Sequence, residues 1–213
     1  MFPDLRPAFL RADANATFYP PPDNGQKPHM TTRSNEFRTS RNAAGYDGVA
    51  KFFHWLVVLL IAAQFVIGWV MPDIHKGTRP DGLIAWHLGV GAALIAAVLL
   101  RIVWRLTHRP TPAPLSPLLS AVSHITHGLL YVTLVAVPVL GWANASSRGW
   151  SVKLFGVLPY PAISPVGSSV GHAMGDIHGN LAWVLFALIA LHIAGALYHR
   201  FVLKDQVLDR MLP

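Results

Sequence analysis

Four long segments of the chain contain no Asp, Glu, Lys or Arg, and this feature constrains the fold more than any other. They cover residues 52–72, 83–100, 110–147 and 177–199. A helix needs about 20 apolar residues to cross a hydrocarbon core of roughly 30 Å. Charged residues make up 13% of the 213 residues, about half of the roughly 25% that is typical of soluble domains. The sequence therefore predicts four membrane-spanning helices and argues against a soluble enzyme or a nucleic-acid-binding domain.

The third segment is longer than one span, and its proline-rich start predicts a loop. We therefore expect helices at about residues 50–71, 83–105, 121–143 and 177–201, with a kink at Pro138. The expected fold class is all-α, an integral membrane four-helix bundle formed by residues 46–213. Residues from about 144 to 176 are expected to form one large loop rich in Gly, Pro and Ser.

Residues 1–45 differ from the rest of the chain. They contain three consecutive prolines at positions 20–22, scattered polar residues and no sustained apolar run. This composition predicts a disordered tail and does not match a secretory signal. Met30 lies within the tail, which raises the hypothesis that the natural chain starts there.

The distribution of basic residues predicts the orientation, because Lys and Arg accumulate in cytoplasmic loops. If both termini are cytoplasmic, only four of the 17 Lys and Arg residues lie outside: Lys76, Arg79, Arg148 and Lys153. The net charge of +7 is then an excess on the cytoplasmic side and needs no nucleic-acid partner. We expect a multi-pass protein of a bacterial inner membrane.

No Asp, Glu, Lys or Arg lies deep in a predicted span, whereas several histidines lie within the spans, and an ionisable residue in a membrane is a functional candidate by default. Seven of the 11 histidines lie within or at the ends of the spans: His54, His87, His124, His127, His178, His192 and His199. Each of them taken alone is equally well explained as an interfacial side chain bonded to a backbone carbonyl. The set as a whole is more informative than any member.

The depth of each histidine predicts two pairs. His178 and His192 are 14 residues apart on the fourth helix, so both point the same way and lie about 21 Å apart along the axis. His87, near the outer face, matches His178, and His54, near the inner face, matches His192. His199 shares the helix face of His192, and His124 or His127 matches the depth of His54, so these three are alternative ligands.

Paired neutral imidazoles across a bundle core suit an iron porphyrin with both axial positions filled. Such a haem has no open coordination position, which favours electron transfer. The chain has no cysteine, which excludes iron–sulfur clusters, thiolate zinc sites and thioether-attached haem. We therefore expect two non-covalent b haems in the bundle core, with iron held by His54, His87, His178 and His192.

Several short motifs together resemble the bacterial di-haem cytochrome b561 family. They are YDGVAKFFHWLV at 46–57, RPDGLIAWHLGVG at 79–91, SHITHGLLYVTLVAVPVLGW at 123–142, SRGWSVKLFGVLPYP at 147–161 and IHGNLAWVLFALIALHIAGALYHRFVLKD at 177–205. Each motif is degenerate, but their order and spacing are specific, and the resemblance covers residues 46–212. Only the N-terminal tail departs from the family pattern.

The resemblance implies a four-helix membrane bundle with two b haems, whose ligands fall on the four histidines paired above. It also implies electron transfer between one-electron partners on the outer side and membrane quinone, with ubiquinone as the expected acceptor. Some family members resemble a superoxide oxidase that reduces ubiquinone. The expected partners are therefore lipid, quinone and either superoxide or a redox protein, and the protein is expected to be an oxidoreductase.

Two other functions are compatible with the sequence. One is a cytochrome b anchor subunit that passes electrons from a partner dehydrogenase or hydrogenase, and the other is a haem-free membrane scaffold. In the superoxide version, the four outer cations would attract the anion, although each is also explained by contact with lipid phosphates or haem propionates. Arg101, Trp104 and Arg105 are candidates for a quinone site and are equally well explained as interfacial anchors.

Overall fold

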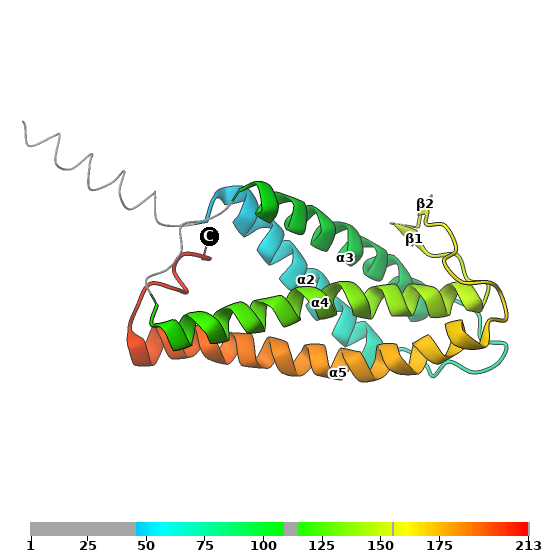
Figure 1. Ribbon diagram of the computed structural model, residues 1–213. Helices are drawn as coiled ribbons and strands as arrows, with labels where there is room; N and C mark the ends of the chain where they lie inside the picture. The colour runs from blue at the N-terminus through cyan, green and yellow to red at the C-terminus, as the bar shows by residue number, and fades with distance from the viewer. Residues whose placement is uncertain (1–45, 109–114, 155, 213) are drawn as a thin grey trace, which may run out of the picture. The chain divides into compact units, whose positions relative to one another are not determined.

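The computed structural model describes residues 46–108, 115–154 and 156–212, which all belong to one compact unit spanning 40–213. The predicted disordered tail and the alternative start at Met30 lie outside the described residues. Four long helices follow one another: α2 (Gly48–Val70), α3 (Gly82–Thr107), α4 (Pro117–Ser147) and α5 (Ser169–Tyr198). All four are long and apolar enough to cross a membrane, and the all-α four-helix prediction is confirmed (Figure 1).

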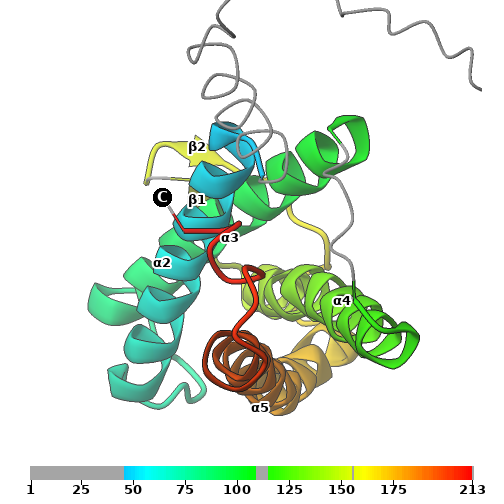
Figure 2. The same cartoon turned by 90° about the vertical axis from the view of Figure 1, so that its left-hand side faces the viewer.

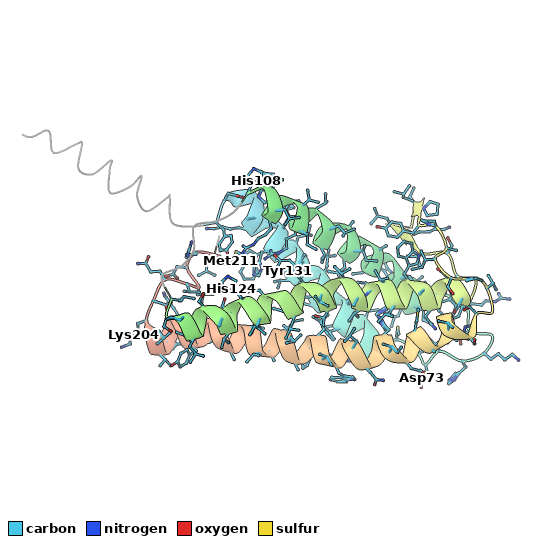
Figure 3. All side chains as sticks on the ribbon, in the orientation of Figure 1. Asp73, His108, His124, Tyr131, Lys204 and Met211 are labelled. Carbon is cyan, nitrogen blue, oxygen red and sulfur yellow. The ribbon has the colours of Figure 1, made fainter. Side chains whose placement is uncertain are left out.

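The helices run alternately up and down, so the described chain has two ends. At the terminal end α2 and α4 begin and α3 and α5 finish, and the chain continues there into a π-helix, η1 (His199–Leu203). At the loop end lie the 71–81 connection and the longer 148–168 connection, which contains the strands β1 (Lys153–Leu154) and β2 (Leu158–Pro159). Figure 3 labels Asp73 at the loop end and His108, Lys204 and Met211 at the terminal end.

Side-chain caps explain where three helices begin. The Asp47 carboxylate accepts a hydrogen bond of 2.7 Å from the backbone N–H of Ala50 at the start of α2. This bond lowers the pKa of Asp47 below its usual value. Ser116 and Ser168 cap α4 and α5 in the same way, by accepting from the N–H groups of Leu119 and Gly171. Each cap satisfies a backbone donor that has no partner within the helix.

Two helices are longer than the sequence predicted. α4 begins at Pro117 rather than near residue 121, because proline fits the first helical position, where its missing N–H is not needed. It continues through Pro138 and ends at Ser147 rather than near residue 143. α5 begins at Ser169 rather than near residue 177. The predicted 144–176 loop is therefore shortened to the 148–168 connection, because both of its ends are helical.

The four helices form two neighbouring pairs. α2 packs along α3, α4 packs along α5, and α3 and α4 join the pairs. In the described residues, no Cα atom of α2 lies within 8 Å of a Cα atom of α5, and Figure 2 shows the two pairs side by side in cross-section. Long aromatic side chains cross this separation instead, such as Phe65 and Phe186, whose ring centroids are 5.3 Å apart. The backbones of α2 and α5 thus leave room between them that only large groups can fill.

In contrast to the separated backbones of α2 and α5, the backbones of α4 and α5 approach each other closely at the loop end. A Cβ added to Gly171 would lie 2.5 Å from the Cβ of Ser147, and one added to Gly175 would lie 2.7 Å from the Asn144 amide nitrogen. The Asn144 side chain also donates hydrogen bonds to the carbonyl oxygens of Gly171 and His172. Small residues permit this close approach within a membrane, and they fix the start of α5 against the end of α4.

The last residues return from η1 to the start of α2. Lys204 ends η1 in the left-handed conformation, with a φ of 55°. The Lys51 ammonium donates to the carbonyl of Leu212 at 2.6 Å, and the Trp55 indole donates to that of Met211 at 3.0 Å. These bonds attach the C-terminal segment to the terminal end of the bundle.

The contact at Gly171 can be tested by adding one methyl group. Gly171→Ala is expected to lower the free energy of unfolding in detergent by about 1–3 kcal/mol, because the Cβ has no space beside Ser147 and Ser164. Gly179→Ala on the same helix is the matched control, since its Cβ would meet nothing within 4 Å. Thermal unfolding followed by circular dichroism compares the two variants, and equal effects would contradict the packing described for α4 and α5.

Candidate functional site

The structure brings His87 and His178 together at the loop end. His87 comes from the first half of α3 and His178 from α5, and their ring centroids are 6.0 Å apart with an interplanar angle of 85°. They reach each other because α3 and α5 both run from the loop end, and both residues lie within three turns of the helix start.

The ring of His178 is held against α4. Its Nδ1 atom lies 2.8 Å from the carbonyl oxygen of Val137, to which Nδ1–H donates a hydrogen bond. Gly141 creates the space for the ring, because a Cβ at this position would lie 2.9 Å from the His178 Nδ1 atom. A hydrogen bond from Nδ1 to a backbone carbonyl leaves Nε2 with a free electron pair, which is the usual state of a metal-binding histidine.

His87 packs against α2 because each of the two helices offers a glycine to a polar side chain of the other. Its ring lies 3.6 Å from the Cβ position of Gly68, and the Gln64 amide lies 3.0 Å from the Cβ position of Gly91. The amide of Gln64 donates a hydrogen bond of 3.1 Å to the carbonyl of His87. The Nδ1 atom of His87 is buried without a hydrogen-bond partner among the described residues.

A second group of histidines lies at the terminal end. His54 from α2 and His192 from α5 have ring centroids 6.5 Å apart. His127 from α4 lies closer to His192, with centroids 5.1 Å apart. The Nδ1 atom of His127 is bonded to the carbonyl of Ser123 at 2.7 Å. In the described residues, no set of three or more His and Asp side chains has an arrangement that could bind a metal ion directly.

The other two histidines left open by the sequence lie elsewhere. His199 contacts Asp205 through a 2.6 Å Nδ1–Oδ2 hydrogen bond. Burial raises the pKa of Asp205, but the hydrogen bonds with His199 and with the N–H of Val207 outweigh it and leave the pKa below its usual value. His124 is exposed, and its Nδ1 atom bonds to the carbonyl of Ser120. Neither residue joins a histidine pair.

Both pairs fit an iron porphyrin held from two sides. A metal–imidazole bond is about 2.0 Å long, so imidazoles on opposite sides of one iron have ring centroids about 6 to 6.5 Å apart. The separations of 6.0 Å for His87–His178 and 6.5 Å for His54–His192 match this value, whereas the 5.1 Å of His127–His192 is too short. The wide separation of α2 and α5 also fits a large group bound between the helix pairs.

Apolar side chains fill the bundle between the two histidine levels. Leu130 and Val137 of α4 and Leu185 of α5 form a buried cluster, and Phe65 of α2 packs against it. The levels are separated by the 14 residues between His178 and His192, which is about 21 Å along a helix. An electron can pass through apolar packing of this kind without a water-filled path. Ions cannot, because a charge inside an apolar region of a membrane is costly.

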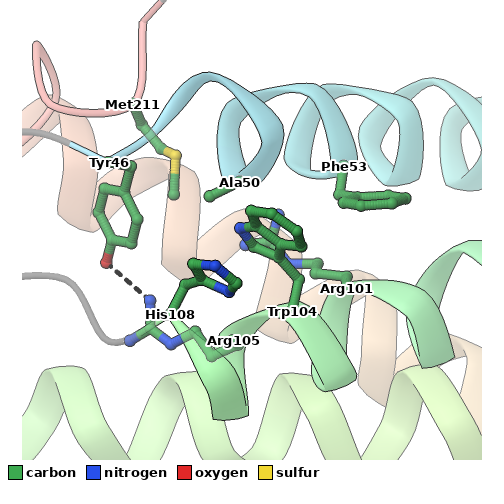
Figure 4. Close-up of a pocket in the computed structure, with 8 residues that line it drawn as sticks. All are labelled: Tyr46, Ala50, Phe53, Arg101, Trp104, Arg105, His108 and Met211. Carbon is green, nitrogen blue, oxygen red and sulfur yellow. Dashed lines mark hydrogen bonds between the residues drawn. The ribbon is translucent and has the colours of Figure 1, made fainter.

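A pocket opens at the terminal end between α2, α3 and the C-terminal segment (Figure 4). Its walls include Tyr46, Trp104 and His108, whose ring is stacked on Trp104 with centroids 3.8 Å apart. Arg105 donates a 3.1 Å hydrogen bond to the Tyr46 hydroxyl. Arg101 reaches the same pocket from one turn deeper in the bundle. The pocket therefore combines aromatic surfaces with guanidinium donors.

The loop end carries exposed charges of both signs. Lys76, Arg79 and Lys153 are exposed, while Arg148 is tied to Asn144 by a hydrogen bond of 3.1 Å and lies 5.4 Å from the centroid of the Trp150 ring. Three exposed carboxylates share this end of the described chain: Asp73, Asp81 and Asp176. The surplus of positive charge is therefore small.

Comparison with known proteins points to a membrane cytochrome. The sequence model of the family described as prokaryotic cytochrome b561 matches residues 45–213. A protein of Yersinia pestis named probable superoxide oxidase CybB is 31% identical over 167 residues, which cover 75% of this chain and 91% of that protein. Cytochrome b561 homolog 2 of Escherichia coli is 28% identical over 171 residues, which cover 78% and 90%. Cytochrome b562 of Cereibacter sphaeroides is 26% identical over 174 residues, which cover 79% and 95%.

The space beside His178 can be tested with a pair of glycine variants. Gly141→Ala is expected to push the His178 ring away from Val137 and to weaken haemin binding by the purified apoprotein at least tenfold. Gly68→Ala is the control, because its Cβ would lie at an ordinary contact distance of 3.6 Å from His87. Absorbance titration with haemin measures both affinities. A Gly141→Ala protein that binds haemin as tightly as the Gly68→Ala protein would contradict the role given to Gly141.

Proposed function

The chain belongs to the prokaryotic cytochrome b561 family of membrane electron-transfer proteins, and on this basis we propose that it carries electrons between the two sides of the membrane with two b haems. The observation that carries the proposal is the presence of two histidine pairs at opposite ends of the bundle, each with the ring separation that iron between two imidazoles requires. His87 and His178 form the loop-end site, and His54 and His192 form the terminal-end site.

Haem iron, when bound at these sites, supplies a one-electron carrier at each side of the membrane. With one imidazole from each of two helices, each site would leave no coordination position for oxygen or substrate. The carbonyl of Val137 fixes the His178 ring in the tautomer in which Nε2 keeps a free electron pair for iron. The cluster around Leu185 keeps water out of the space between the sites.

The orientation follows from the basic residues. Six basic residues of the described chain lie at the terminal end: Lys51, Arg101, Arg105, Arg200, Lys204 and Arg210. Because positively charged segments stay in the cytoplasm, the terminal end faces the cytoplasm and the loop end faces the periplasmic side of the bacterial inner membrane. Electrons from an outer donor then enter beside the His87–His178 site.

Superoxide is the donor we propose, and ubiquinone is the acceptor. Lys76, Arg79 and Lys153 attract a small anion to the loop end. Each superoxide gives up one electron and becomes dioxygen, and two electrons with two protons convert one quinone into quinol. We assign the quinone to the terminal-end pocket because its walls supply aromatic surfaces and guanidinium donors for a carbonyl oxygen. The pocket has an open volume of only about 10 Å³ in this structure, so a quinone would have to displace side chains that line it.

Replacing single histidines tests the ligand assignment. His87→Ala and His54→Ala are each expected to reduce the haem content from about two to about one per chain, because each removes one ligand of one site. His199→Ala and His127→Ala are the controls, since His199 is bonded to Asp205 and the ring of His127 lies too close to His192. Pyridine haemochrome absorbance per chain measures the content. Loss of one haem in His127→Ala with full content in His54→Ala would transfer the ligand role to His127.

The donor is tested with the purified protein alone. Superoxide generated in solution is expected to reduce the haems, with quinol formed when ubiquinone is added, and the rate is expected to fall several-fold between low and high salt. A triple variant with Lys76, Arg79 and Lys153 replaced by Gln should lower the rate and its salt dependence, whereas Arg200→Gln at the other end should not. If the haems are reduced only in the presence of a partner dehydrogenase or hydrogenase, the protein is an anchor subunit instead.

A further inference from the structure

Arg101 is a cation inside the membrane-spanning part of the bundle, and no carboxylate of the described residues is paired with it. It lies on α3, six residues before the helix ends. Its Nη1 atom is buried and has no hydrogen-bond partner among the described residues. Its Nε–H group makes only a long hydrogen bond of 3.4 Å to the hydroxyl of Tyr131 on α4. A buried guanidinium without a counter-ion is costly in a medium of low dielectric constant.

The carboxylates of the described terminal end are already engaged with other groups. Asp47 accepts from the N–H of Ala50 and from the indole of Trp104. Asp205 bonds to His199, and Asp209 pairs with Arg200 at 3.0 Å. The described part of the chain therefore supplies no anion to Arg101.

Arg101 faces the terminal-end histidines. The antiparallel contacts of α2 and α3 place Gln64 opposite Gly91 and Gly68 opposite His87, and the same register places Arg101 opposite His54. Arg101 also interacts electrostatically with His54, His127 and His192. Its charge is thus directed toward the space that the terminal-end site would give to a bound group.

We propose that Arg101 binds a carboxylate of the group held at the terminal-end site, namely a propionate of the haem between His54 and His192. This inference rests on the proposed function. A carboxylate fits the buried guanidinium because it offers both a negative charge and two acceptor oxygens for the N–H groups. A neutral quinone oxygen would accept a hydrogen bond from Arg101 but would leave its charge uncompensated.

The pairing has two consequences for electron transfer. It sets the direction in which the porphyrin enters the bundle, with its carboxylates toward α3 and Arg101. It also places a fixed positive charge beside one of the two irons, and a nearby cation favours the reduced state because reduction removes one positive charge from the iron. Arg101 therefore raises the reduction potential of the terminal-end haem, which favours electron flow from the loop end to the terminal end.

A redox titration of the purified protein followed by absorbance tests the proposal. The wild type is expected to show two one-electron steps. Arg101→Gln should shift one step to a more negative potential and leave the other unchanged, and Arg101→Lys should restore part of the shift because it keeps the charge. Arg200→Gln is the control, because it removes the same charge from an exposed side chain at the same end. Two unchanged steps in Arg101→Gln would overturn the proposal.

A second experiment identifies the carboxylate and remains available if Arg101→Gln binds haem poorly. Wild-type apoprotein is loaded with the dimethyl ester of haem, which lacks both propionate charges. The ester is expected to bind the terminal-end site more weakly than haem in the wild type, with a much smaller difference in Arg101→Gln and an intermediate one in Arg101→Lys, which keeps the charge. If haem and its ester bind the wild type equally, Arg101 does not bind a propionate.

These outcomes are distinct from failure of the proposed function. A wild type that holds no b haem, or a single haem, contradicts the two-site proposal itself. A wild type with two redox steps that are both insensitive to Arg101 preserves the two haems and refutes only the assignment of Arg101.

Discussion

The requirement that every polar nitrogen inside a membrane finds a partner governs this structure. Imidazole rings and one guanidinium lie within the apolar bundle, where an unsatisfied polar group is costly. The protein meets the requirement for His178 with the carbonyl of Val137 and for His127 with the carbonyl of Ser123. Among the described residues of the spans, the buried nitrogens that stay unpartnered are His87 Nδ1 and Arg101 Nη1, and Arg101 Nη1 is the one that a carboxylate of a bound group can satisfy.

The positions of the glycines determine how closely the helices approach one another and where the histidine rings fit. At the loop end, Gly171 and Gly175 bring α5 against α4, while Gly141 and Gly68 give the rings of His178 and His87 a surface to lie on. The same helix that approaches α4 so closely stays away from α2. A bundle made of two closely packed helix pairs, with α2 and α5 apart, can hold flat groups between its two halves and still keep an apolar core around Leu185 between the levels. The tight contacts therefore determine where the wide space lies.

Much of this arrangement follows from the sequence, and the rest depends on how the helices pair. The spans are visible because each lacks charge, and the two histidine levels follow from depth along antiparallel helices. The beginnings of α4 and α5 were missed because Pro117 and the glycines near Gly171 suggest loops, whereas proline suits a first turn and glycine suits a close interface. The closeness of His127 to His192, and of Arg101 to His54, depends on the register between neighbouring helices. Pairs such as Gly141 with His178 reveal that register only in three dimensions.

The central claim is that each end of the bundle holds one iron between two imidazoles. Electron paramagnetic resonance of the oxidised wild-type protein in detergent tests it most directly, because six-coordinate and five-coordinate ferric haem give different signals. The account predicts two low-spin signals of equal intensity, one for each histidine pair. A single low-spin signal that accounts for all the iron, or a dominant high-spin signal, would contradict it.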